Sequence, residues 1–115
     1  MEAAHGFAHA GRVPRVVITG SQPHHLSQAE AHAWLRTEVG SLRALPGVES
    51  VVLTRARSSV GGANPWAWLC ELHLADGADA DAVAEHSLCR NWMGDLRLLG
   101  MHPALVVLDS GERVV

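Results

Sequence analysis

The chain has 115 residues, a length typical of one domain, and 48% of them are hydrophobic against 18% charged. This balance excludes a disordered chain, and no apolar run reaches the roughly 20 residues that cross a bilayer. The net charge is −3, and all nine basic residues are Arg, scattered along the sequence. Since there is no basic patch and no nucleic-acid-binding motif, we expect neither nucleic acid nor a membrane as partner.

Residues 1–12 resemble a flexible N-terminal lead-in, and residues 13–115 a single domain. The lead-in has no basic start followed by a long apolar stretch, so no signal peptide is predicted. Cys70 and Cys89 are too far apart for a CxxC motif, which favours two buried thiols and a cytoplasmic location. The absence of Lys and the abundance of Ala, Gly, Val and Arg point to a GC-rich, bacterial source.

The first half of the domain contains a β-branched strand over 13–19, a loop over 20–25 and a helix. Ser27 and Glu30 have the spacing of a capping box, which predicts where this helix begins. The helix is expected to continue to about Leu45, where a Pro-Gly pair ends it. Apolar residues recur along it at helical spacing: Ala31, Trp34, Leu35, Val39, Leu42 and Leu45.

The second half begins with strands over 48–57 and 65–74, joined by a Gly-rich connection. An Asp-rich turn then favours a second helix over 80–99, because carboxylates stabilise helix N-termini. A fourth strand is predicted over 102–109, and residues 110–115 are candidates for a short further strand.

The predicted order is therefore βαββαβ, which indicates a ferredoxin-like α+β fold with a four-stranded antiparallel sheet and two helices on one face. The strands, however, are apolar on both faces: Val16 and Ile18 alternate with Val17, and Leu105 and Val107 alternate with other apolar residues. A sheet apolar on both faces needs both faces covered. Because one chain supplies helices for one face only, we expect a homodimer.

Trp66 and Trp68 stand two residues apart, so in a strand both indoles point to the same face. They are predicted either to pack in the core or to form the apolar wall of a ligand pocket. Asn64, just before them, is either a turn residue or a donor to a substrate oxygen.

On the second helix, His86, Arg90, Met93 and Arg97 form a stripe beside Trp92. The stripe is either a solvated edge or the rim of a cleft. In a cleft, His86 is the candidate general base and Arg90 the anchor for an anionic or phenolic group.

Glu38 lies within the apolar arc of the first helix, where a carboxylate needs a partner. A salt bridge and a role in a substrate site are both consistent with this position. Of the eight histidines, His5 and His9 have an HxxxH spacing that would suit a metal on a helix, but Gly6 and Gly11 argue against a helix there. We therefore expect no metal and no cofactor.

Three features together resemble the dimeric α/β-barrel superfamily: the LPGVESV turn into the second strand, the Trp-bearing third strand, and LRLLGMHP before the last strand. In that superfamily two ferredoxin-like subunits pack sheet to sheet. The resemblance covers roughly residues 13–110.

The antibiotic-biosynthesis monooxygenases are the group within it to which the sequence is most similar. They oxidise polycyclic aromatic phenols without a cofactor, and an Asn and a Trp four residues later belong to their site. The resemblance implies catalytic roles for Asn64 and Trp68, with Arg90 and His86 from the second helix. Trp66, Trp92, Met93 and Glu38 are then expected to contact the substrate. The chain has no Tyr to match the pocket Tyr of that group.

The expected function is thus a cofactor-independent monooxygenase that binds a planar aromatic, polyketide-like metabolite between the sheet and the second helix. The alternative is a non-catalytic dimeric module that binds a ligand or assists another protein.

Overall fold

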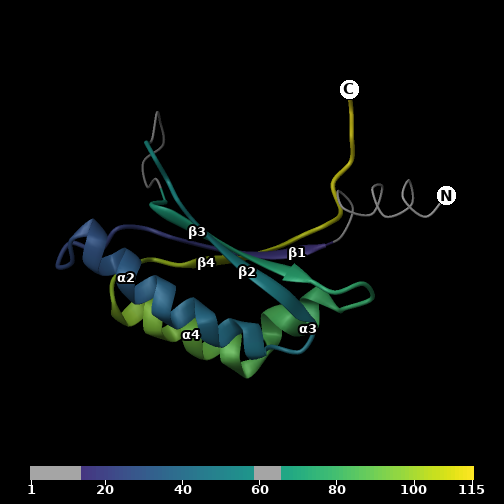
Figure 1. The fold of residues 1–115 in the computed structure, drawn as a ribbon, viewed down its shortest axis with the longest axis horizontal. Coiled ribbons are helices and arrows are strands. Elements are labelled where there is room, and N and C mark those ends of the chain that lie inside the picture. Colours follow the sequence, from purple (N-terminus) through teal and green to yellow (C-terminus); the bar gives the residue numbers. More distant parts are fainter. Residues whose placement is uncertain (1–13, 59–65) are drawn as a thin grey trace.

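The computed structural model describes residues 14–58 and 66–115, and it has a four-stranded antiparallel sheet covered by helices on one face (Figure 1). The strand order is β2-β3-β1-β4. The strands are β1 (Arg15–Gly20), β2 (Val48–Arg55), β3 (Trp68–Leu74) and β4 (Ala104–Leu108). The helices are α2 (Gln28–Val39), the 3₁₀ helix η1 (Gly40–Ala44), α3 (Ala80–Glu85) and α4 (Ser87–Leu98). Within the described ranges, no helix is both long enough and apolar enough to span a bilayer.

Helix α2 begins where the capping box predicts. The Ser27 hydroxyl accepts a hydrogen bond from the backbone N–H of Glu30 at 3.1 Å, and the Ser27 N–H donates to the Glu30 carboxylate at 2.9 Å. Two of the otherwise unpaired N–H groups of the first turn are satisfied in this way. The α-helix ends at Val39, and the 3₁₀ turn of η1 carries the chain to Leu45, where the backbone becomes extended.

The expected continuous helix over 80–99 is wrong, because the chain is interrupted at His86. That residue has an extended backbone (ψ 145°), and its imidazole Nδ1 accepts a hydrogen bond from the N–H of Leu88 at 3.1 Å. His86 therefore ends α3 and serves as the N-cap of α4. Asp79 caps α3 in the same manner, as the Asp-rich turn predicted.

The strands are shorter than expected, and β3 begins at Trp68. Trp66 precedes the strand and is 49% exposed, so the prediction that Trp66 and Trp68 share one strand face is wrong. The candidate strand over 110–115 is also not formed.

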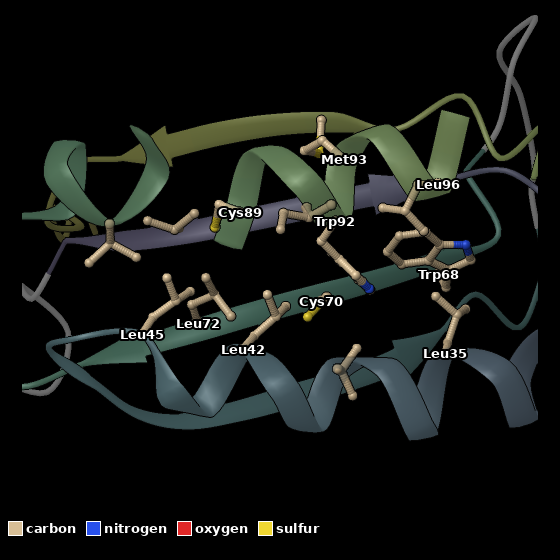
Figure 2. Close-up of a cluster of buried hydrophobic side chains, with 14 of the residues drawn as sticks. Leu35, Leu42, Leu45, Trp68, Cys70, Leu72, Cys89, Trp92, Met93 and Leu96 are labelled. Carbon is tan, nitrogen blue, oxygen red and sulfur yellow. The ribbon is translucent and has the colours of Figure 1, made fainter. Parts of the chain in front are cut away.

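The core fills the space between the sheet and the helices (Figure 2). Side chains of β3 alternate so that Trp68, Cys70 and Leu72 are buried against Leu35 and Leu42 of the α2–η1 segment and against α4. The indoles of Trp68 and Trp92 meet edge to face, with ring centroids 6.0 Å apart. Burial raises the pKa of the Cys70 thiol to about 12, so this thiol stays protonated in the core.

Within residues 14–58 and 66–115, no helix covers the other face of the sheet (Figure 1). A cross-strand row on that face runs through Val52, Glu71, Val17 and Val106, one residue from each strand. The valines at the two edges are 41% and 45% exposed, and Glu71 forms an ion pair with Arg15 at 3.0 Å. The expected apolar side chains are present on this face at the three valines, but the Arg15–Glu71 ion pair lies on it too, so the face is apolar only in part.

Candidate functional site

A cavity of about 360 Å³ lies between α2 and the end of the sheet where β2 ends and β3 begins. Its volume falls within the range of small-molecule sites. The apolar part of its wall includes Ala31, Leu35 and the indole of Trp68. The remaining lining residues are mainly polar or basic: Gln22, Gln28, His32, Arg55 and Arg57, with Ala56 and Ala67 beside them.

Two elements position these side chains. On α2, Gln28, Ala31, His32 and Leu35 follow the i, i+3, i+4, i+7 pattern, so they lie on one face of the helix. On the sheet, Arg55 stands directly opposite Trp68 in the β2–β3 ladder. Opposite residues of an antiparallel pair project from the same face, so the Arg55 side chain leaves the sheet on the helix side.

Four buried side-chain nitrogens have no partner among the described residues, on His32, Trp68, His73 and Trp92. Two of them, the Trp68 indole Nε1 and the His32 imidazole Nδ1, belong to residues that line this cavity. In Figure 2 the indole nitrogen points away from Leu42 and Leu45, toward the end of the core where α2 begins. A buried donor without a hydrogen bond costs roughly 1–3 kcal/mol, which makes such atoms uncommon.

The environment of His32 favours its neutral form. Burial lowers the pKa of the imidazole, and the positive charges of Arg55 and Arg36 lower it further. At neutral pH the ring therefore has one nitrogen able to accept a proton, which is the state that a general base requires.

A wider, more open groove of about 970 Å³ adjoins the cavity and shares five lining residues with it, among them Gln22, Gln28 and Arg57. Trp66, His24 and His102 also line this groove. His102 has a φ of 45°, a left-handed backbone that is uncommon in non-glycine residues. The groove and the cavity are therefore neighbouring hollows that share part of their lining, and both are open to solvent.

The structure places the predicted site residues in different parts of the molecule. Trp68 lines the cavity and Trp66 the wider groove. Asn64 lies outside the described residues, so its distance from Trp68 stays a prediction.

None of the candidates from the second helix lines the described cavity, although Trp92 packs against Trp68, which does. Arg90 is exposed, and His86 uses its Nδ1 to cap α4. Trp92 and Met93 are buried in the core, so the stripe from His86 to Arg97 is not a single solvated or ligand-facing edge. Glu38 is half-buried and lines neither of the two hollows. The described cavity lies beside α2, and the expected site beside the second helix stays a prediction.

Sequence reasoning missed His32, Arg55 and Arg57. His32 has a signal in the sequence, because it occupies the same helical face as Ala31 and Leu35 and is polar within an apolar arc. Arg55 has no such signal in the sequence, because only its pairing with Trp68 in the sheet shows to which face the Arg55 side chain points.

Known proteins resemble this chain in structure but not in sequence. No family model matches the sequence, and no curated protein matches it. An EthD family protein from Bacillus halodurans has a TM-score of 0.61 at 20% identity, covering 88% of this chain and 98% of that one. The protein At3g17210 from Arabidopsis thaliana has a TM-score of 0.65 at 8% identity, covering 90% of this chain and 100% of the other.

A third solved structure is a dimeric ferredoxin-like protein of unknown function from Thermobifida fusca, with a TM-score of 0.54 at 15% identity over 86% of this chain and 92% of that one. The fold is ferredoxin-like. The expected likeness to the dimeric ferredoxin-like superfamily is thus confirmed for the fold. A ferredoxin-like domain supports many activities, so the function has to be argued from the site itself.

Proposed function

We propose that this protein is a cofactor-independent enzyme that binds a planar aromatic metabolite in the cavity beside Trp68. The observation that carries the proposal is the 360 Å³ cavity whose wall combines a buried indole with unpartnered polar atoms of Trp68 and His32. An apolar wall with a few convergent polar groups is the usual construction of a small-molecule site.

The residues present fit a monooxygenase reaction on an electron-rich phenol. The neutral imidazole of His32 would accept the proton of the substrate, and the Trp68 N–H would donate to the oxygen that becomes negative. The resulting anion reacts with O₂ directly. In a hydroxyanthrone, for example, the ring methylene becomes a carbonyl with one oxygen atom, while the other oxygen leaves with both hydrogens as water.

We also propose that two chains associate through the uncovered face of the sheet. The row through Val52, Val17 and Val106 offers an apolar surface, and a ferredoxin-like neighbour is described as dimeric. The two free thiols fit a reducing compartment such as the cytoplasm.

To test the enzymatic proposal, a large side chain is introduced in the exposed first turn of α2 so that it fills the cavity. Gln28 lines the cavity, so Gln28→Trp places an indole in its mouth, whereas Ala29→Trp puts the same side chain on the neighbouring exposed position that does not line it. With 1,8-dihydroxyanthrone as substrate, we expect oxygen uptake and quinone absorbance from the wild type and Ala29→Trp, and a loss of about tenfold or more in Gln28→Trp because the substrate is excluded.

Equal rates in all three proteins would contradict a role for this cavity. Binding of the anthrone without any oxygen uptake by the wild type would instead favour the non-catalytic ligand-binding module. Circular dichroism of both Trp variants checks that the fold is retained.

A further inference from the structure

The charges around the cavity are all of one sign. Arg55 and Arg57 line it together with the neutral His32, and none of its described lining residues is Asp or Glu. This is unusual in a chain whose net charge is −3. In the part of the chain that the structure describes, the one ion pair joins Arg15 to Glu71 on the far face of the sheet. Both cavity guanidinium groups therefore lack a carboxylate partner there.

Arg55 and Arg57 are exposed to solvent, and two positive charges without carboxylate partners beside one hollow attract an anion. A guanidinium group also presents its N–H donors in a planar fork that matches the two oxygens of a carboxylate. Burial and the nearby positive charge of Arg55 lower the pKa of His32, so its imidazole is neutral. A neutral His32 adds a hydrogen bond without a further charge.

The position of Arg55 decides where an anion would sit. Arg55 faces Trp68 across the β2–β3 ladder, and both side chains leave the sheet toward α2. The indole N–H of Trp68 is buried and unpartnered on the same side. Arg55, at the polar end of the cavity, and Trp68, its aromatic wall, are thus cross-strand neighbours.

We infer that the molecule held in this cavity carries a carboxylate, which Arg55 binds together with Arg57 while the planar apolar part lies against Trp68. This inference rests on the proposed function, in that it takes the cavity to be the ligand site, and it adds the chemical class of the ligand. A phenol without a carboxylate would offer the two guanidinium groups only the single oxygen of its phenolate, which does not match the two-donor fork of either.

The experiment compares two probes of the same shape, 2-naphthoate and its neutral methyl ester, by isothermal titration calorimetry at pH 7. For the wild type, we expect the naphthoate to bind about tenfold more tightly than the ester, or better, which corresponds to at least one charge-assisted hydrogen bond. Arg55→Gln should remove this preference, raising the Kd of the naphthoate about tenfold and leaving that of the ester unchanged. Arg43→Gln is the matched control, because Arg43 is exposed on η1 and does not line the cavity.

Arg57→Gln is the second variant, and it should weaken the naphthoate in the same direction. Equal Kd values for the two probes in the wild type, or an unchanged preference in both cavity variants, would overturn the carboxylate inference and leave the aromatic site in place. If neither probe binds the wild type, the proposed use of the cavity fails as well.

Discussion

Gly20 shows how one residue shapes the aromatic wall of the cavity. It stands opposite Trp68 in the β1–β3 ladder, and the indole lies directly over it. A Cβ at this position would overlap the benzene ring of Trp68 and lie 2.9 Å from its Nε1. Since Trp68 is only 2% exposed, its ring has little room to move aside. The absence of a side chain at Gly20 is therefore what allows the indole to lie flat on the sheet.

We predict that Gly20→Ala lowers the free energy of unfolding by about 1–3 kcal/mol, the usual cost of overpacking a core. Urea denaturation followed by Trp fluorescence measures the change. Gly40→Ala is the control, because nothing lies within 4 Å of a Cβ there and the backbone is in the right-handed helical region. That variant should be neutral or more stable by up to about 1 kcal/mol. Equal stability of Gly20→Ala and wild type would mean that the indole does not pack on Gly20.

At the scale of helices and strands, the sequence predicts the features that depend on residues close together in the chain. The start of α2 follows from Ser27 and Glu30 alone, because both partners of the capping box lie within one turn. The βαββαβ order follows from the period of apolar residues and the positions of Gly and Pro. These features allow the fold to be predicted without any knowledge of tertiary contacts.

The break between α3 and α4 could not be predicted in the same way. His86 is not among the preferred N-cap residues, and the apolar spacing of the helix continues across it. The residues that line the cavity could not be predicted for a related reason. Helical spacing puts His86 and Arg90 together on one helix, but only the strand register brings Arg55 to Trp68, and only the packing of α2 brings His32 to both.

At the scale of the whole molecule, the two faces of the sheet differ in what they contact. Its helix-covered face holds the core and the cavity, and its other face carries the row from Val52 to Val106. An exposed apolar sheet face is normally covered in solution. The proposed dimer would cover this face and leave the cavity on the opposite side.

We predict a molar mass of twice the 12.3 kDa chain by size-exclusion chromatography with light scattering. Val106→Arg should shift the protein to the single-chain mass, because a charge buried between two sheets is costly. Leu98→Arg, on the exposed side of α4, adds the same charge to a side chain that is 87% exposed and should leave the mass unchanged. A wild type that elutes at the mass of one chain would rule out the dimer.

The central claim is that ligands bind between α2 and the sheet, with Arg55 at the polar end. A crystal structure of the 2-naphthoate complex tests it most directly. We predict electron density for the ring system against Trp68 and Leu35, with the carboxylate within hydrogen-bonding distance of Arg55. Density for the ligand beside Arg90 on α4, with the cavity next to α2 left empty, would contradict the claim.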